Sequence, residues 1–413
     1  MQETDEQMST QIIFVQDKFY LGGIEVLELK LADELLHRGF NTVIASRANE
    51  TLDAPTAGYT RFLHEGYPDF ISRSLNLPSN IAQKVIFVSL HPTAEIATEI
   101  AARRIQRKYG KRISVHHFHW VSHSRAFFFA KNRYVRMLFE KIFFLLPVNS
   151  TYFMNDIARI AHQKFWRRSL EDYPVLRIIG REPTSNFAIE DNIESNTKKH
   201  DRPKLRIVSV GRLVPFKSYN VYAPIIIRKL RDAGIDATWD IWGYGPDEAK
   251  IASKAQEYEV NDFVNLRGKL PHELFDETVS SYDVFVGMGT ALLEAAKTGM
   301  PVCVAVENQV DACYGHLHET PSDSVGDRDD RFPEHSLDKV LRVFSGLSER
   351  QRLAIGKKDA MAARARESTL SEFVTTILSA EPITKVGLFK SPSLSVGKLF
   401  LVIKNWKLER DQS

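Results

Sequence analysis

The sequence has few of the features that mark disulfide-rich, membrane-spanning or strongly charged proteins. Its two cysteines, Cys303 and Cys313, exclude a disulfide framework and a four-cysteine zinc site. No run reaches the ~18 consecutive apolar residues of a membrane-spanning helix. The 55 Lys and Arg residues nearly balance the 52 Asp and Glu residues, for a net charge of +3. Because no nucleic-acid-binding motif accompanies this balance, no nucleic-acid partner is expected.

What the sequence does contain is enough apolar material for large cores. It has 413 residues, of which 43% are hydrophobic and 26% charged, and at roughly 150 residues per domain this points to two domains, or at most three. The N-terminal stretch MQETDEQMST is acidic and polar and does not resemble a secretory signal peptide. We therefore expect a cytoplasmic protein, with the inner face of the cell membrane as an additional location.

The first half of the chain alternates short apolar strands with amphipathic helices. Strands are predicted at 12–15, 42–45, 85–88 and 112–115, and a helix at 94–107. A glycine-rich turn at 21–25 leads into a helical pattern that Gly39 ends. Strand, turn, helix and strand within about 35 residues form a βαβ unit.

The second half repeats this alternation after a polar segment, 189–204, which we interpret as the interdomain linker. Strands are predicted at 205–210, 237–242, 264–266, 284–286 and 302–305, with helices between them at 222–233, 247–258, 273–280 and 292–297. The two repeats predict an α/β protein of two Rossmann-like, doubly wound lobes that face one another across a cleft. We expect domains at 1–188 and 205–375, and a C-terminal segment, 376–413, that packs back on the first lobe.

Open α/β sheets bind ligands beyond the carboxyl ends of their strands, so the residues there indicate function. Gly211, Arg212 and Lys217 follow the strand at 205–210. Glycine lets a ligand approach the backbone, and the two cations suit a diphosphate, arginine through forked hydrogen bonds and lysine as a point charge. For this segment taken alone, two solvated surface cations are the alternative.

Two later strand exits carry Gly-x-Gly patterns. Gly243 and Gly245 lack the third glycine of a GxGxxG fingerprint, so an ordinary tight turn is the favoured interpretation of that segment alone. Gly289 and Thr290 open a helix whose free N–H groups and positive end favour a phosphate. Glu294 lies about one turn inside, where it would accept hydrogen bonds from ribose hydroxyls; an exposed helix-face glutamate is the alternative.

Together these segments resemble the nucleotide-sugar half of retaining GT-B glycosyltransferases of the family 4 type (glycosyl transferases group 1). The resemblance rests on VSVGRLVPFKSYN, WDIWGYGPDE, VNLRGKLPHELF and LLEAAKTGMPV. The opening segment FYLGGIEVLELKLADELLHRGFNTVIAS is similar to the family's Gly-Gly loop and first helix. The resemblance implies a retaining hexosyltransferase that moves a sugar from a nucleotide diphosphate sugar to a saccharide or lipid-linked acceptor. It implies no cofactor and no obligatory metal, and a place in bacterial surface polysaccharide, lipopolysaccharide or glycolipid biosynthesis.

By matching positions, the resemblance assigns Arg212 and Lys217 to the donor diphosphate and Glu294 to the ribose. It places Gly22 and Gly23 against the donor phosphate or the acceptor. The acceptor would bind to the first lobe and the nucleotide sugar to the second. The physical chemistry agrees, because a departing nucleoside diphosphate develops negative charge that two cations and a helix N-terminus stabilise without Mg²⁺.

One departure from the family pattern concerns the first of two glutamates separated by seven residues, which contacts the donor sugar. Val286, eight positions before Glu294, stands in its place inside a predicted strand. We infer that backbone groups at 287–290 take over these contacts. The missing glutamate also motivates an alternative function, a catalytically inactive GT-B-like protein that binds a nucleotide sugar or a partner protein.

The histidines of VHHFHWVSHS follow the strand predicted to end at residue 115. Alternation places His117 and His119 on one face, and they are candidates for the cleft histidine that contacts the donor sugar in GT-B relatives. A packing role is the alternative interpretation. Since no carboxylate or cysteine accompanies them in the sequence, we do not expect a metal site.

Three further segments have two interpretations each. Asp327, Arg328 and Asp329 match the DxD metal motif of the GT-A fold, but no strand precedes them and a chance match in a polar loop is expected. Segments 125–146 and 386–407 mix cations with apolar residues. Each is predicted either to pack within a lobe or to contact anionic lipid as a peripheral membrane surface.

Overall fold

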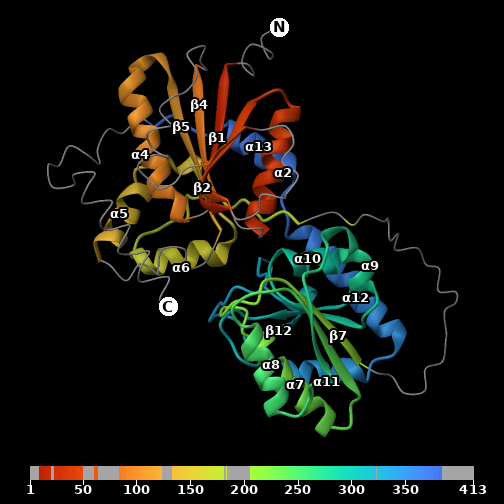
Figure 1. The fold of residues 1–413 in the computed structure, drawn as a ribbon. Coiled ribbons are helices and arrows are strands. Elements are labelled where there is room, and N and C mark those ends of the chain that lie inside the picture. The colour runs from red at the N-terminus through yellow and green to blue at the C-terminus, as the bar shows by residue number, and fades with distance from the viewer. Residues whose placement is uncertain are drawn as a thin grey trace. The chain divides into compact units, whose positions relative to one another are not determined.

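The chain forms two compact units in a computed structural model that describes residues 9–19, 23–49, 60–63, 83–90, 92–122, 133–180, 183, 205–321 and 323–383. Unit 1 comprises Met1–Arg177 and Ser368–Ser413, and unit 2 comprises Ile178–Glu367 (Figure 1). The expected linker at 189–204 and the basic, apolar tail at 386–407 lie outside the described residues.

Unit 1 is built on a parallel sheet with the strand order β3-β2-β1-β4-β5-β6. The strands are β1 (Thr10–Phe19), β2 (Asn41–Asn49), β3 (Thr60–Leu63), β4 (Lys84–Ser89), β5 (Ser114–Val121) and β6 (Thr151–Phe153). The connecting helices are α2 (Gly23–His37), α4 (Pro92–Tyr109), α5 (Arg133–Phe143) and α6 (Asp156–Trp166). Strand β4 is buried from its second residue to its last, as expected where helices cover both faces of a parallel sheet.

The last described helix, α13 (Leu370–Leu378), belongs to unit 1. Phe373 is fully buried and its ring meets that of Trp120 edge-on, with centroids 5.5 Å apart. Beyond the helix, the Ile383 N–H donates to the Val115 carbonyl at 2.8 Å. The C-terminal helix therefore packs in the core of unit 1, and the part of the chain that returns to this unit begins at Ser368, before the expected start at 376.

Unit 2 has a seven-stranded sheet with the order β13-β12-β11-β10-β7-β8-β9. The strands are β7 (Leu205–Val210), β8 (Ala237–Trp242), β9 (Val264–Gly268), β10 (Val284–Gly287), β11 (Val302–Ala305), β12 (Ala312–His316) and β13 (His335–Ser336). The helices are α7 (Tyr219–Asp232), α8 (Glu248–Glu257), α9 (Phe275–Ser280), α10 (Thr290–Lys297), α11 (Leu337–Ser345) and α12 (Glu349–Ala365). Strand β12 pairs antiparallel with both β11 and β13, and the other neighbouring strands pair in parallel.

The order of the strands in unit 2 reverses at β7. The chain first adds β8 and β9 on one side of β7 and then adds β10 and β11 on the other. Such a reversal leaves a crevice at the carboxyl ends of the two strands that flank it, which is where open α/β sheets bind ligands. The topology therefore directs attention to the exits of β7 and β10.

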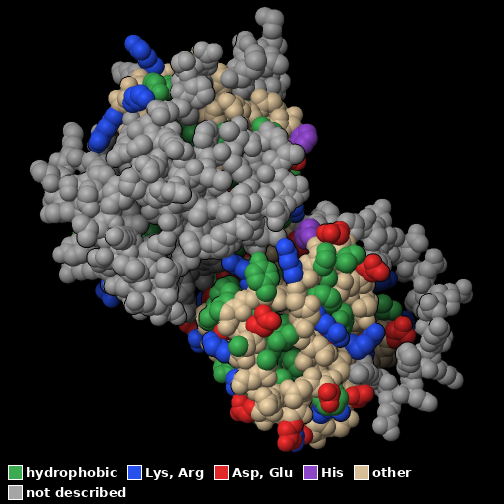
Figure 2. All heavy atoms as spheres, in the orientation of Figure 1, with side chains coloured by type: hydrophobic (Ala, Val, Ile, Leu, Met, Phe, Trp, Pro, Cys, Tyr) green, Lys and Arg blue, Asp and Glu red, His purple; other side chains and the backbone are tan. Residues whose placement is uncertain are grey.

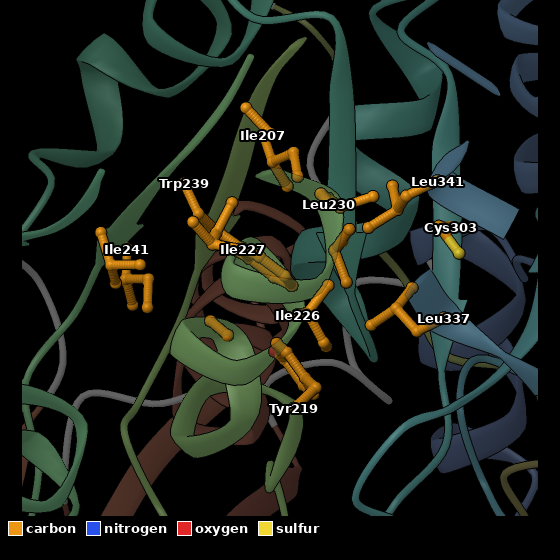
Figure 3. Close-up of a cluster of buried hydrophobic side chains, with 14 of the residues drawn as sticks. Ile207, Tyr219, Ile226, Ile227, Leu230, Trp239, Ile241, Cys303, Leu337 and Leu341 are labelled. Carbon is orange, nitrogen blue, oxygen red and sulfur yellow. The ribbon is translucent and has the colours of Figure 1, made fainter. Parts of the chain in front are cut away.

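The core of unit 2 packs helix α7 on this sheet (Figure 3). Trp239 of β8 is fully buried, and its indole N–H donates to Ser209 Oγ at 2.8 Å, while that hydroxyl donates to the Val286 carbonyl. The polar atom of the largest core residue is thereby satisfied, and adjacent strands are joined through it. On the face drawn in Figure 2, Lys and Arg side chains of unit 2 are interspersed with Asp and Glu.

Three predicted strands in unit 2 have the bounds that the structure gives them, Leu205–Val210, Ala237–Trp242 and Val302–Ala305. The strand predicted at 112–115 is wrong in its end, because β5 runs on to Val121 and contains the histidines that were expected to follow it. Helix α4 packs against β5 and covers these histidines. The strand is therefore buried although it contains polar side chains. Within the described ranges, no helix has both the length and the apolarity needed to cross a membrane.

Candidate functional site

The exit of β7 brings Arg212 and Lys217 together. Lys217 Nζ lies 2.7 Å from the point that a Cβ atom on Gly211 would occupy, so the lysine folds back over the glycine. Burial, and then the nearby Arg212 cation, lower the pKa of Lys217 to about 8. Arg212 is exposed, and neither side chain has an ion-pair or hydrogen-bond partner in the described part of the chain. Two cations at one strand exit have the charge that an anion requires.

The two glycines of the β8 exit serve backbone packing. A Cβ on Gly243 would be 1.8 Å from the Gly211 carbonyl oxygen, and one on Gly245 would be 2.3 Å from that of Leu213. The Gly211 N–H donates to the Trp242 carbonyl and the Leu213 N–H to the Tyr244 carbonyl, each at 2.9 Å. This turn therefore fixes the conformation of the loop that carries Arg212 and Lys217. Positions 243 and 245 require glycine because any side chain there would clash with the backbone of that loop.

A second turn holds the same loop from the β11 side. Asn308, which has a φ of 57°, donates its N–H to the Phe216 carbonyl at 2.8 Å. Ser218 Oγ donates to the Gln309 carbonyl at 2.5 Å. Lys217 is thus flanked in sequence by two residues that are anchored to one turn.

Helix α10 begins at the exit of β10, directly after Gly289. Gly289 has a φ of 73°, a region that favours glycine. Its N–H donates to the Val325 carbonyl at 2.7 Å. The sequence analysis expected backbone groups at 287–290 to contact the donor, but this amide is already bound and is not available to a phosphate. The N–H groups of Thr290 and Ala291 have no acceptor among the residues described, and they lie at the positive end of the helix.

Glu294 is half-buried on α10 and lies beside Gly180, whose added Cβ would be 3.4 Å from Glu294 Cγ. Next to it, Lys297 Nζ donates to Glu367 Oε2 at 2.9 Å. The sequence analysis did not find this ion pair. The sequence gives one signal for it, a lysine that directly follows the small residues Ala295 and Ala296 in the predicted helix. The structure shows that both alanines are fully buried.

His117 and His119 lie in the core of unit 1, and neither is exposed. Ser89 Oγ joins them, 2.9 Å from His117 Nε2 and 3.0 Å from His119 Nδ1. Burial, and then His117 and His162, hold the pKa of His119 well below its usual value. Their shared face agrees with the predicted alternation, and their burial favours the packing interpretation over contact with a donor sugar.

Two buried carboxylates lie near these histidines in the fold, although no carboxylate accompanies them in the sequence. Glu99 Oε2 is 3.6 Å from His117 Nδ1, and Glu95 Oε2 is 3.8 Å from His119 Nε2. Both acids come from α4, which the sequence order does not place beside the histidines. Within the described ranges, no group of three or more His, Cys, Asp or Glu side chains has a geometry suited to a metal ion.

The remaining candidates are placed as follows. Gly23 is the first residue of α2, whereas Gly22 lies outside the described residues. Both oxygens of Asp329 accept hydrogen bonds from Arg331 Nε, at 2.8 and 2.9 Å, so this carboxylate of the DxD match is already paired. In α5, the apolar residues Phe139 and Phe143 are buried in the core of unit 1, which favours the packing interpretation of the described part of 125–146.

With this geometry in place, comparisons with known proteins can be added. Residues 189–310 match the family model described as "Glycosyl transferases group 1". Two curated relatives match stretches of similar length. The GPI3 subunit of phosphatidylinositol N-acetylglucosaminyltransferase from Saccharomyces cerevisiae is 27% identical over 123 residues. The putative colanic acid biosynthesis glycosyltransferase WcaL from Escherichia coli is 30% identical over 110 residues. These matches cover 28% and 24% of this chain, and the chain spans only 27% of each relative's length.

Solved structures match over most of the chain. WaaG, a glycosyltransferase involved in lipopolysaccharide biosynthesis, gives a TM-score of 0.58 at 14% identity, covering 90% of this chain and 100% of that one. A glycosyltransferase from Rickettsia africae gives 0.59 at 12% identity, covering 90% and 99%. The fold is GT-B. The resemblance drawn from the sequence to glycosyl transferases group 1 is confirmed over residues 189–310.

Proposed function

We propose that the chain transfers a hexose from a nucleoside diphosphate sugar to a saccharide or lipid-linked acceptor, with retention of anomeric configuration and without an obligatory metal ion. One observation carries the proposal. Arg212 and Lys217 lie together, without a described partner, at the strand exit where the sheet of unit 2 reverses its order. A departing diphosphate needs such a site, because its negative charge grows as the glycosidic bond breaks.

The side chains of unit 2 divide the work between them. Lys217, with a pKa of about 8, is protonated at neutral pH and would meet the diphosphate as a point charge, and Arg212 would meet it as a fork. The first turn of α10 would add backbone N–H groups to the same charge. Glu294 would accept hydrogen bonds from the ribose hydroxyls. Because His117 and His119 are buried, the proposal gives them no contact with the donor.

The names of the relatives support a polysaccharide or glycolipid acceptor. The matched proteins include one named for colanic acid biosynthesis and one for transfer of N-acetylglucosamine to phosphatidylinositol, and a structural neighbour takes part in lipopolysaccharide biosynthesis. We accordingly propose a role in bacterial surface polysaccharide or glycolipid assembly at the cytoplasmic side of the membrane.

A thermal-shift panel of UDP-, GDP-, ADP- and TDP-sugars tests the proposal. A ligand that binds only the folded protein raises Tm by mass action, and we expect one nucleotide class to raise the Tm of the wild type more than that of the Lys217→Met variant. Lys229→Met on α7, which removes the ion pair of that lysine with Asp311, is the matched control. A panel with no shift contradicts the proposal. Donor binding without sugar transfer or hydrolysis would favour the inactive, nucleotide-sugar-binding alternative.

A further inference from the structure

One aromatic residue at the exit of β8 is exposed to solvent. Tyr244 is 49% exposed, and in the described part of the chain neither its ring nor its hydroxyl has a hydrogen-bond, cation or ring partner. Single exposed apolar side chains are common on protein surfaces. Whether this tyrosine has a function therefore depends on what the fold places next to it.

The pairing of β7 with β8 continues beyond the ends of both strands. The two strands pair in parallel register up to their last residues. After them, the Gly211 N–H donates to the Trp242 carbonyl at 2.9 Å. The Leu213 N–H then donates to the Tyr244 carbonyl at 2.9 Å. These bonds keep the register of the sheet, in which Arg212 is opposite Tyr244. Opposite residues on neighbouring strands are ~4.8 Å apart and project from the same face, so the cation and the aromatic residue are neighbours.

The backbone that carries Tyr244 is held on both sides. Gly243 and Gly245 flank it with φ values of 151° and 154°, a region that favours glycine. On the β7 side the Tyr244 carbonyl accepts the Leu213 N–H, and on the β9 side the Gly243 N–H donates to the Gly268 carbonyl at 2.7 Å. A residue on a backbone that is already fixed loses less conformational freedom when a ligand binds. The turn therefore presents the tyrosine at a defined place next to the cation.

The proposed function leaves one part of the donor without a binding residue. It assigns the diphosphate to Arg212 and Lys217 and the ribose to Glu294, but it assigns nothing to the base. A base is a flat aromatic ring that is joined through the ribose to a strongly charged group. Arg212 and Tyr244 offer the two matching chemistries side by side, because aromatic side chains stack on the π-face that every base has.

We propose that Tyr244 binds the base of the nucleotide by stacking its ring on the base. The inference rests on the proposed function, since it needs the diphosphate to lie at Arg212. Because the π-face is common to all bases, the tyrosine adds affinity for the nucleoside end of the donor and does not select between bases.

The test compares ligands that do and do not carry a base. Isothermal titration calorimetry measures the Kd of UDP, GDP, ADP and TDP, and of ribose 5-diphosphate, which keeps the ribose and the diphosphate but has no base. We expect the wild type to bind one of the nucleotides more tightly than ribose 5-diphosphate. In Tyr244→Ala that nucleotide should bind about tenfold more weakly, equivalent to about 1.4 kcal/mol, while ribose 5-diphosphate keeps its wild-type Kd.

Two further variants separate stacking from other effects of the substitution. Tyr244→Phe keeps the ring and should retain the wild-type affinity for the nucleotide. Tyr244→Leu keeps an apolar side chain without a π-face and should lose affinity as Tyr244→Ala does. Urea unfolding checks that the variants are folded, and the exposure of the ring predicts little change in stability. The matched control is Met361→Ala, which removes an exposed apolar side chain from α12 and should change neither Kd.

The outcomes separate this inference from the proposed function. If none of these diphosphates binds the wild type, the proposed function is wrong. If a nucleotide binds but Tyr244→Ala keeps its Kd, the stacking role is wrong and the proposed function stands. An equal loss for the nucleotide and for ribose 5-diphosphate also overturns the inference, because the ring then acts through the loop and not on the base. A loss seen with the glucose derivative of the nucleotide but not with the free diphosphate overturns it as well, since the ring then contacts the transferred sugar.

Discussion

The Gly211 carbonyl oxygen lies 1.8 Å from the point where a Cβ on residue 243 would begin, so Gly211 and Gly243 are in direct backbone contact. The turn that follows β8 therefore packs against the loop that carries Arg212 and Lys217 and stabilises the conformation of that loop. The Gly-x-Gly pattern at 243–245 indicated a tight turn, and the structure adds the surface against which that turn packs.

Gly243→Ala should separate the two loops. Overpacking of this kind costs about 1–3 kcal/mol, to which the φ of 151° at this residue adds strain. Urea unfolding measures the loss, and we expect donor binding to weaken as well. Gly234→Ala is the control, because Gly234 has a φ of 80° but no atom within 4 Å of an added Cβ, so it reports the backbone strain alone. Equal losses in the two variants would contradict the packing argument.

The affinity for a nucleoside diphosphate should depend on the protonation of Lys217. Its pKa of about 8 means that the free protein loses this charge as pH rises from 7 to 9.5, so the Kd should increase across that window. Lys217→Arg should remove this pH dependence, because arginine stays protonated throughout. Lys217→Met should bind about 10-fold to 100-fold more weakly at pH 7, as expected for loss of a charged hydrogen bond. A wild-type Kd that is constant from pH 7 to 9.5 would be incompatible with this role.

Glu28 of α2 predicts a pH dependence of stability. It is fully buried and accepts a hydrogen bond from Gln16 at 2.5 Å. Burial raises its pKa to about 8 from 4.5, with a smaller contribution from Glu25 and against the opposing effect of the Gln16 hydrogen bond. Between pH 4.5 and 8 the folded protein therefore binds more protons than the unfolded chain, and the free energy of unfolding falls as pH rises.

Glu28→Gln should remove that slope. We expect the variant to match the wild type near pH 5 and to exceed it by about 1 kcal/mol or more at pH 8, measured by urea unfolding at four pH values. Glu34→Gln, which removes a partly exposed ion pair with Arg38 on the same helix, should leave the slope unchanged. A Glu28→Gln variant whose stability declines with pH as steeply as the wild type would refute the assignment.

Asp359 of α12 should be critical for the stability of unit 2. Its side chain is fully buried and accepts hydrogen bonds from the Val302 N–H at 2.9 Å, from the His318 N–H at 2.9 Å and from His318 Nδ1 at 2.6 Å. Asp359→Ala leaves these donors without an acceptor and should cost about 3 kcal/mol. Asp330→Ala, which removes an exposed partner of Arg328, should cost less than about 1 kcal/mol. Similar losses in both variants would show that the buried acceptor is not the cause.

The sequence located the five parallel strands of unit 2 because each is a short apolar run, as at 205–210, but it missed β12 and β13, which are not apolar runs. It could not show that β5 continues through its histidines. Their burial depends on Glu95, Glu99 and Ser89, which come from other elements. The ion pair of Lys297 and Glu367 was equally hidden, because the two residues are 70 positions apart. That Arg212 and Lys217 bind a donor stays a prediction.

The order of synthesis has a consequence for unit 1. Its last helix, α13, follows the whole of unit 2 in the chain. On the ribosome, unit 2 is contiguous and is able to fold as soon as it emerges, but the part of unit 1 made earlier must wait. Until Phe373 leaves the exit tunnel, the indole of Trp120 lacks the ring that covers it. The part of unit 1 that precedes unit 2 is thus completed only after unit 2 has been made, and until then its exposed apolar surface calls for chaperone protection.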